Sequence, residues 1–373
     1  MNFDFSDEQS ALNEAVQRWV EKAFPFERRQ ALARAGGATR EVYRELAELG
    51  LTGLTIAPEH GGLGLGAVEA MLVMQTLGRG LVPAPYADAA LRAPGLLAQG
   101  DAVLQAAWLP RIADGSALVV LAQQERGARY RPDAVTTSAS PTAAGWAVTG
   151  LKHLVPAGDE ADAFLVPART GTGGDAPIAL FLVERANVTL RAYPTQDGAR
   201  AADLTLAAAP ARLVMADATE ALALAADVGI AAVCAEGVGL MERLLDVTVE
   251  YMNTRKQFGV AIASFQALRH RIADAKMQLE LARSMSYYAS LKLGEPAAQR
   301  CRALSQAKVQ LGQSMRFVGQ QCIQLHGGIG VTDDYIASHC FKRLTMLELA
   351  HGDTLHHLGV VSQRMQDTAG VFA

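Results

Sequence analysis

Two segments in the last third of the chain contain residues that could hold a phosphate-bearing cofactor. In the first, Arg255 lies near the predicted end of a long helix at Gly259, and Phe258 precedes that glycine. A guanidinium group donates paired hydrogen bonds to phosphate oxygens, so Arg255 suits a phosphate clamp. In a purely structural interpretation, the same positive charge complements the dipole at the carboxyl end of the helix.

The next predicted helix begins after Ser264, a residue type that caps helices, and Gln266 lies in its first turn. The second segment joins Gln324 to the adjacent glycines Gly327 and Gly328 at the end of another helix. Glycine closes many helices in the left-handed conformation, which is the structural interpretation. The functional interpretation is that bare backbone approaches a ligand while Gln324 supplies an amide group. No βαβ pattern surrounds the pair, which therefore differs from the GxGxxG fingerprint.

Three blocks of sequence pattern must position these residues. Up to about residue 115 the apolar residues repeat at helical spacing. Short apolar runs with frequent turn signals follow and predict a compact antiparallel β-barrel or sandwich. Long helices with apolar stripes then predict a bundle with seams left for oligomerisation. The predicted fold is mainly α with a central β domain, and its domains are an N-terminal helical domain (1–115), a middle β-barrel (116–217) and a C-terminal four-helix-bundle domain (218–373).

Composition excludes several classes of partner. The 373 residues carry a net charge of −4, which gives no general attraction for nucleic acid or anionic membranes. The most apolar stretch, residues 222–240, is interrupted by Asp227 and Glu236, so we expect no membrane insertion. The four cysteines lie far apart, without disulfide or zinc-site spacing. We expect a cytoplasmic protein without a metal site.

The two segments, in this order and spacing, resemble the acyl-CoA dehydrogenase family, as does the glycine-rich loop at residues 58–64. The order of helices, barrel and helices fits the fold of that family. The resemblance implies FAD as cofactor, acyl-CoA as substrate and electron-transfer flavoprotein as electron acceptor. It assigns FAD contacts to Arg255, Phe258, Gln266, Gln324, Gly327 and Gly328, and on the barrel to Gln124, Val155 and Pro156.

In the family these groups hold the FAD of a neighbouring subunit. We therefore expect a homo-oligomer built as a dimer of dimers, or a hetero-oligomer with a large-subunit paralogue. Residues 193–198, 317–321 and 341–346 further resemble the subgroup of pimeloyl-CoA dehydrogenase small subunits. That resemblance implies a dicarboxylyl-CoA substrate, for which Arg126, Arg129 and Arg200 are candidate carboxylate partners.

The chain departs from the family pattern on the barrel. Gln124 begins the stretch that replaces the family's Thr-Glu-Pro segment. Residues 154–156 replace a Trp-Ile-Thr segment whose threonine contacts the flavin ring. Pro156 has neither a hydroxyl nor an amide donor, so this contact is predicted to be lost.

The catalytic base is a further departure. Removal of a proton α to a thioester carbonyl needs a base, and the resemblance aligns the family's glutamate with His351. The other location of the base in the family falls near Gly229, with Asp227 and Glu236 on either side. His351 is a candidate base because an unperturbed histidine has a pKa of about 6.5. Asp353 is a second candidate, and an inert surface histidine is the structural alternative.

Three functions remain open at this point. The first is an FAD-dependent acyl-CoA dehydrogenase of fatty acid metabolism with an atypical base. The second is a catalytically silent, FAD-binding subunit that supports a base-bearing partner. The third is a flavin oxidase or monooxygenase of the same fold.

Overall fold

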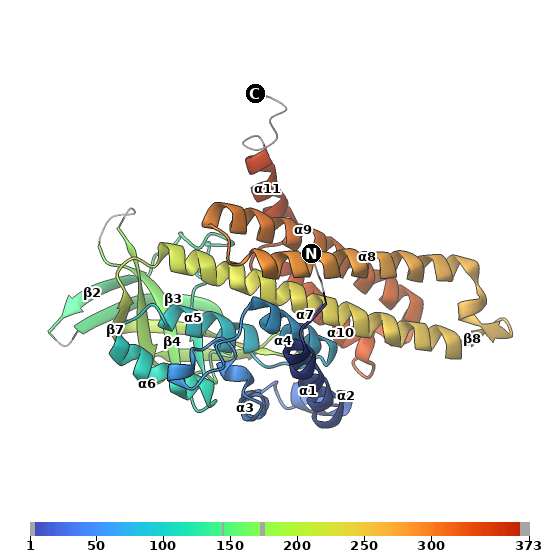
Figure 1. The fold of residues 1–373 in the computed structure, drawn as a ribbon, viewed down its shortest axis with the longest axis horizontal. Coiled ribbons are helices and arrows are strands. Elements are labelled where there is room, and N and C mark those ends of the chain that lie inside the picture. Colours follow the sequence, from blue (N-terminus) through green and yellow to red (C-terminus); the bar gives the residue numbers. More distant parts are fainter. Residues whose placement is uncertain (1–3, 144, 172–175, 366–373) are drawn as a thin grey trace. The chain divides into compact units, whose positions relative to one another are not determined.

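Helices, a β-barrel and helices follow one another along the chain in the computed structural model, which describes residues 4–143, 145–171 and 176–365 (Figure 1). The predicted fold class is thereby confirmed. The chain forms two compact units, and the N-terminal helical segment is divided between them. The first unit contains Met1–Ala31, Ala67–Val82 and Ile230–Ala373, and the second contains Leu32–Gly66 and Pro83–Gly229.

The first helix, α1 (Asp7–Ala23), begins with a capping box. The Ser6 hydroxyl accepts a hydrogen bond from the backbone amide of Gln9, and the Gln9 side chain accepts one from the amide of Ser6. These bonds satisfy donors that the first turn of a helix leaves unpaired. The helices that follow are α2 (Phe26–Arg34), α3 (Arg40–Glu48), α4 (Ala67–Arg79), α5 (Ala93–Leu97) and α6 (Ala102–Ala113), with the short helical turns η1 (Leu51–Gly53), η2 (Pro58–His60) and η3 (Ala87–Arg92).

The glycine-rich loop at residues 58–64 has a packing role. A Cβ atom on Gly62 would lie 2.0 Å from the carbonyl oxygen of Ile56, so only glycine fits there. Gly61 and Gly64 have positive φ angles of 80° and 62°. Close backbone approach and left-handed turns therefore account for these glycines without a ligand.

The strands of the second unit close into a barrel. Neighbouring strands pair in the ring β4–β2–β3–β7–β5, and β5 pairs again with β4. Most pairs are antiparallel, whereas β4 pairs in parallel with β1 and with one residue of β2. The strands are β1 (Val119–Leu121), β2 (Ser138–Thr142), β3 (Gly145–Pro156), β4 (Ala163–Arg169), β5 (Ile178–Glu184), β6 (Thr189–Pro194) and β7 (Arg200–Met215).

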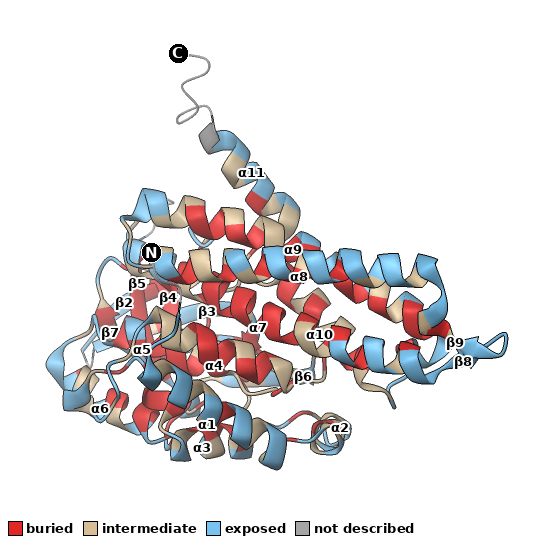
Figure 2. Ribbon diagram, turned by 45° about the vertical axis from the view of Figure 1, so that its right-hand side comes forward, coloured by how far each residue is buried: buried red, intermediate tan, exposed pale blue. Residues whose placement is uncertain are grey.

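The carboxyl-terminal helices share a core of small and branched apolar residues. The helices are α7 (Thr219–Thr254), α8 (Gln266–Lys292), α9 (Ala297–His326), α10 (Ile336–Leu349) and α11 (Thr354–Met365). Buried residues follow one side of α9, including Leu311, Met315, Val318 and Cys322, which are at most 1% exposed (Figure 2). This apolar stripe therefore packs inside its own chain and leaves no free seam along these positions.

Helix α7 is the one helix of the described residues that is long and apolar enough to cross a membrane. In the structure, 72% of its most apolar window is buried. Its residues Cys234, Val238 and Met241 belong to the core that α8, α9 and α10 complete. Its apolar character thus matches that of a core helix.

Candidate functional site

The segment around Arg255 is a β-hairpin, and the prediction that α7 extends to Gly259 is wrong. Helix α7 ends at Thr254, and two short strands, β8 (Lys256–Gln257) and β9 (Val260–Ala261), pair beyond it (Figure 1). The turn residues Phe258 and Gly259 both have positive φ angles, 53° and 81°. Two consecutive positive φ angles are typical of the tight type I′ turn that joins hairpin strands. Arg255 is held in place because its amide donates to Tyr251 O at 2.8 Å.

The start of α8 also differs from the prediction. Phe265, without a side-chain cap, precedes the helix, and Gln266 is its first residue. The Ser264 hydroxyl instead donates to the carbonyl of Ala261 at 2.7 Å and closes a 3₁₀ turn. Gln266 is exposed in the first turn of α8, where backbone amides attract anions.

The structure brings the two predicted cofactor segments together. Leu325 packs in one buried cluster with Met252 and Ile262, which flank the hairpin on either side. The ring of His326 lies 4.8 Å from the ring of Tyr251 in the last turn of α7. Sequence positions about 70 residues apart therefore form one surface of the first unit.

This surface offers the donors that a dinucleotide needs. Arg255, Gln266 and Gln324 are exposed, and Phe258 is 91% exposed at the hairpin tip. A Cβ atom added to Gly327 or Gly328 would meet nothing within 4 Å, so the backbone there faces open space. A guanidinium, two amides, bare backbone and an exposed ring fit phosphate and ring groups of a dinucleotide.

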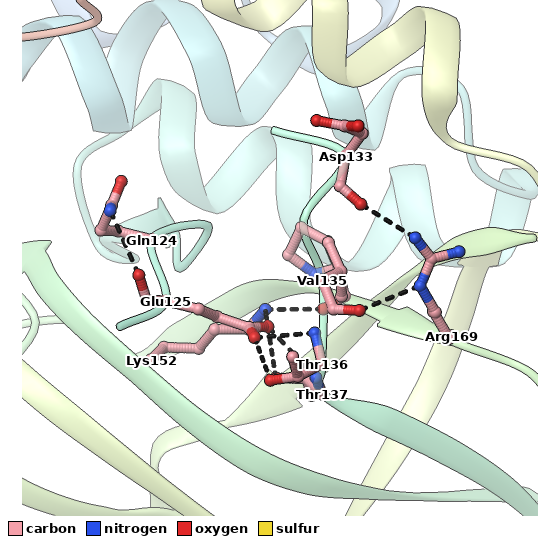
Figure 3. A network of polar contacts seen from close by, with 9 residues as sticks. Gln124, Glu125, Asp133, Val135, Thr136, Thr137, Lys152 and Arg169 are labelled. Atoms are coloured by element: carbon pink, nitrogen blue, oxygen red, sulfur yellow. Dashed lines mark hydrogen bonds and ion pairs between the residues drawn. The ribbon is translucent and has the colours of Figure 1, made fainter. Parts of the chain in front are cut away.

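On the barrel, Gln124 is positioned by a buried ion pair next to it. Glu125 is 3% exposed, and its carboxylate accepts hydrogen bonds from Lys152 Nζ at 2.7 Å and from the amide of Thr136 at 2.7 Å (Figure 3). Thr137 donates its hydroxyl to the same carboxylate at 2.7 Å. The Gln124 carbonyl in turn accepts from the amide of His153 at 2.8 Å.

Burial opposes ionisation of Glu125, but the Lys152 charge and the hydrogen bonds outweigh it and lower the pKa of Glu125 to about 2. Burial also lowers the pKa of Lys152 to about 8. Both groups are charged at neutral pH, and the pair fixes the backbone between β1 and β2 against β3. The carboxylate is fully occupied, so it supplies no catalytic base.

Val155 and Pro156 lie at the end of β3, where they pair with Ala202 and Ala201 of β7. Val155 is 1% exposed and belongs to the barrel core. Its side chain therefore has a packing role, and Pro156 supplies neither a hydroxyl nor an amide proton. Among the three predicted barrel contacts, Gln124 alone carries a polar side chain.

His351 lies in the turn between α10 and α11 with φ at 57°, and Gly352 follows with φ at 109°. Positive φ is unfavourable for a residue with a side chain, and such residues often lie at functional sites. The Asp353 carboxylate accepts a hydrogen bond from the amide of His356 at 2.8 Å. It therefore caps α11, a structural role that suits aspartate at this position.

Glu236, one of the two carboxylates that flank the alternative base position near Gly229, is held in an ion pair. Glu236 is 6% exposed and accepts two hydrogen bonds from the Arg343 guanidinium, at 2.5 and 2.8 Å. Both carboxylate oxygens of Glu236 are thus engaged by one guanidinium group, an arrangement typical of a structural ion pair. Asp227 is also buried, at 5% exposure.

Of the candidate carboxylate partners, Arg200 is occupied, because its Nε donates to Asp159 at 2.6 Å and its Nη1 donates to Gly36 O. Arg126 and Arg129 are exposed on the loop that follows Glu125.

Among the described residues, no group of three or more histidine, cysteine or acidic side chains could hold a metal ion.

A cleft of about 1080 Å³ in the first unit is lined by residues of α1, α4, α7 and α8, including Arg79, Glu242 and Lys276. None of the predicted site residues lines it.

Sequence reasoning missed Glu125 and Lys152 on the barrel, and Lys308 and His357 around the His351 turn. Lys308 carried a signal, because it precedes Leu311 by three residues and so continues the apolar stripe of α9. A charged residue at a core position must have partners, but the sequence does not name them.

Helical segments before and after a closed barrel in the sequence, together with exposed donors suited to a dinucleotide on the first unit, define the class of protein to which the chain belongs. Two family models match the chain: the acyl-CoA dehydrogenase N-terminal domain over residues 6–116 and the C-terminal domain over residues 219–366.

The acyl-CoA dehydrogenase IpdE2 of Mycobacterium tuberculosis is 31% identical over 93% of this chain and 92% of that protein. FadE27 of the same organism, also named an acyl-CoA dehydrogenase, is 29% identical over 88% of this chain and 89% of its own. A structure of the ChsE4–ChsE5 complex from Mycobacterium tuberculosis matches with a TM-score of 0.87 and 27% identity, covering 99% of this chain and 100% of that one.

The chain belongs to the acyl-CoA dehydrogenase family, whose members are FAD-dependent oxidoreductases that act on CH–CH donors.

Proposed function

We propose that this chain is an FAD-dependent acyl-CoA dehydrogenase in which His351 takes the proton from the α-carbon of the thioester. The observation that supports it most directly is the joining of the hairpin and the Gln324 turn into one open surface of cofactor donors. A protein that kept the fold but had lost its cofactor would not need Arg255, Gln266 and Gln324 on that surface.

Arg255 would hold a phosphate of FAD, and Gln266 and Gln324 would donate amide hydrogen bonds to it. Phe258 would pack against a ring, and the bare backbone at Gly327 and Gly328 would allow close approach. When bound, FAD supplies the hydride acceptor for the β-carbon of the acyl chain. The family resemblance implies that this surface serves a cofactor shared with a neighbouring subunit.

The proposed role of His351 is to take the proton from the α-carbon of the thioester and keep it on the imidazole ring. Its imidazole accepts a proton only when neutral, and the turn that carries it is fixed by hydrogen bonds to three of its carbonyl groups. A fixed base contributes about 10² to 10⁴ in rate. Asp353, already capping α11, would act on the turn and not on the substrate.

The test is anaerobic mixing of the FAD-loaded protein with acyl-CoA thioesters of increasing chain length. The expected result is rapid loss of the oxidised flavin absorbance with wild-type protein and a loss about 10² to 10⁴ times slower with His351→Gln. A flavin that no acyl-CoA bleaches would refute dehydrogenation by this chain alone. Rapid oxygen consumption during turnover would instead indicate a flavin oxidase or monooxygenase.

A second candidate is a catalytically silent FAD-binding subunit of a hetero-oligomer. Two observations favour it: neither position of the family's base holds glutamate, and the matched ChsE4–ChsE5 structure is a complex of two differently named chains. Activity that appears only after addition of a glutamate-bearing paralogue would establish this role and refute the first proposal.

For the substrate we propose a dicarboxylyl-CoA, on the resemblance to the pimeloyl-CoA dehydrogenase subgroup. Arg126 and Arg129 are exposed on the loop that follows Gln124, and Arg129 also donates to the Tyr130 hydroxyl at 3.2 Å. Rates of flavin bleaching with a dicarboxylyl-CoA and with a monocarboxylic thioester of equal length, in the wild type and in Arg126→Ala, would test this preference.

We further propose electron-transfer flavoprotein as the electron acceptor, on the family resemblance. We also propose a cytoplasmic location, on the composition.

A further inference from the structure

The turn that carries His351 has a backbone conformation that must be held from outside. His351 and Gly352 both have positive φ angles, at 57° and 109°. A left-handed conformation is unfavourable for histidine, and it persists only where surrounding groups determine it. Three carbonyl groups of residues 348–352 accept hydrogen bonds from side chains outside the turn.

Lys308 of α9 supplies two of these bonds. Its side chain is 0% exposed, and its Nζ donates to Glu348 O at 2.7 Å and to Gly352 O at 2.9 Å. These two carbonyls lie on either side of His351 in the sequence. The ammonium therefore closes the turn by binding both of its ends.

His357 of α11 supplies the third bond. Its Nε2 lies 2.9 Å from the carbonyl oxygen of His351, which can only accept, so this nitrogen carries the proton. Its Nδ1 then accepts from the Ser305 hydroxyl at 3.2 Å. Burial lowers the pKa of His357 to about 4, so the ring is neutral at pH 7 and this arrangement is stable.

The carboxylate of Glu348 has other partners and does not neutralise Lys308 directly. It accepts from Arg316 Nη2 at 3.1 Å and from the Thr354 hydroxyl at 2.7 Å. Burial lowers the pKa of Lys308 to about 8, and Cys234, Glu348 and Asp353 act against that shift. A buried ammonium bound mainly to backbone carbonyls is a poor source of stability, since apolar replacements of buried charges are often neutral or stabilising.

We propose that Lys308 is the positioning residue that presents residue 351 to the substrate, with His357 as its second support. This inference rests on the proposed role of His351 as the base. Lys308 does not itself touch the substrate, because its side chain is fully buried and two of its three N–H groups are already donated.

The position of the turn can be measured without turnover. Hydrogen exchange, followed by mass spectrometry on the FAD-loaded full chain, should be at least tenfold faster across residues 349–353 in Lys308→Met. Exchange in the hairpin of β8 and β9 should not change. The matched control is Lys292→Met, which removes a half-buried lysine paired with Glu295 at the end of α8. In this control residues 349–353 should exchange as in the wild type.

A kinetic cycle separates positioning from a general structural role. Lys308→Met should lower the limiting rate of flavin reduction at least tenfold, with KM within threefold of wild type. In the His351→Gln background, the added Lys308→Met should change the residual rate less than twofold, because the residue through which it acts is already gone.

Should Lys308→Met fail to fold, His357 gives a second pair of variants. His357→Leu removes the donor to His351 O and should raise exchange in the turn, whereas His357→Gln keeps an amide donor and should restore it. If Lys308→Met folds and exchange across residues 349–353 is unchanged, the proposal is overturned. If it does not fold, unchanged exchange in His357→Leu has the same meaning. An additive loss of rate in the double variant Lys308→Met with His351→Gln would also overturn the proposal.

A wild-type chain that leaves the flavin oxidised would refute the proposed function. The exchange experiment would still decide whether Lys308 holds residue 351.

Discussion

Arg255 is the residue on which cofactor retention should depend most. Its amide is fixed to Tyr251, whereas its side chain is exposed beside the hairpin. Arg255→Ala should remove a charge-assisted phosphate contact of about 1.5–3 kcal/mol, which corresponds to roughly 10- to 150-fold weaker FAD binding. Titration of apoprotein with FAD measures the effect.

Lys276→Ala is the matched control for Arg255→Ala. This lysine is exposed on α8 and pairs with Glu280 of the same helix at 2.7 Å. Both residues lie outside the cofactor surface. The control should bind FAD as the wild type does. Wild-type affinity in Arg255→Ala would show that the phosphate clamp lies elsewhere.

His351 should give the reaction a pH dependence of known sign. Only the neutral imidazole can take the α-proton, so the rate of flavin reduction should fall as the pH drops through the range in which histidines titrate. Stopped-flow absorbance at saturating acyl-CoA, from pH 5 to 9, measures the profile. His351→Glu should move the acid limb to lower pH, because carboxylates titrate there. A profile that is flat in the wild type would exclude a histidine base.

At the scale of elements, the barrel depends on the buried pair of Glu125 and Lys152. Lys152→Met would leave an uncompensated carboxylate at 3% exposure, and we expect the free energy of unfolding to fall by about 3–5 kcal/mol. Urea denaturation at pH 7 measures the loss. A change below about 1 kcal/mol would mean that water reaches the carboxylate.

The pair of Glu125 and Lys152 also determines how the free energy of unfolding changes as the pH falls. The pKa of Glu125 is about 2 in the folded protein, below the ordinary value of 4.5. Its contribution to stability is therefore fully present above pH 4.5 and is lost as the pH falls from 4.5 towards 2. In Lys152→Met the ammonium no longer opposes the desolvation of Glu125, so the folded-state pKa of Glu125 should rise and the loss of stability between pH 4.5 and 2 should be smaller than in the wild type. Thermal melting in a series of buffers compares the two variants.

At the scale of the whole molecule, exposed apolar residues predict self-association. The α9 stripe is covered within its own chain, so we expect an interface between subunits to use other residues. Met277 and Leu281 lie one turn apart on α8 and are 55% and 45% exposed, and Phe258 is 91% exposed. Light scattering after size exclusion should give a dimer or tetramer at micromolar concentration.

The double variant Met277→Lys with Leu281→Lys should shift this assembly towards monomer by placing charges in an apolar contact. Gln299→Lys, an exposed position on α9, is the control and should not alter the mass. A wild-type chain that is monomeric at micromolar concentration would refute a cofactor shared between identical subunits. Assembly that requires a paralogue would favour the hetero-oligomer.

The sequence by itself determined what depends on neighbours along the chain. The capping box at Ser6 and the helical stripe of α9 arise from residue types at local spacings along the chain, and both are present in the structure. The order of helices, barrel and helices also followed from the periods of the apolar residues. The two cofactor segments were recognisable because their residue types stand at fixed spacings.

The tertiary structure decided what depends on residues far apart in the chain. Helix α7 ends at Thr254, and the hairpin beyond it packs through Ile262 against Leu325. Lys308 meets the carbonyl of Gly352, 44 residues away, and Glu236 meets Arg343 across 107 residues. A buried charge must find its partner wherever packing places one, and no local pattern specifies a partner at such a distance.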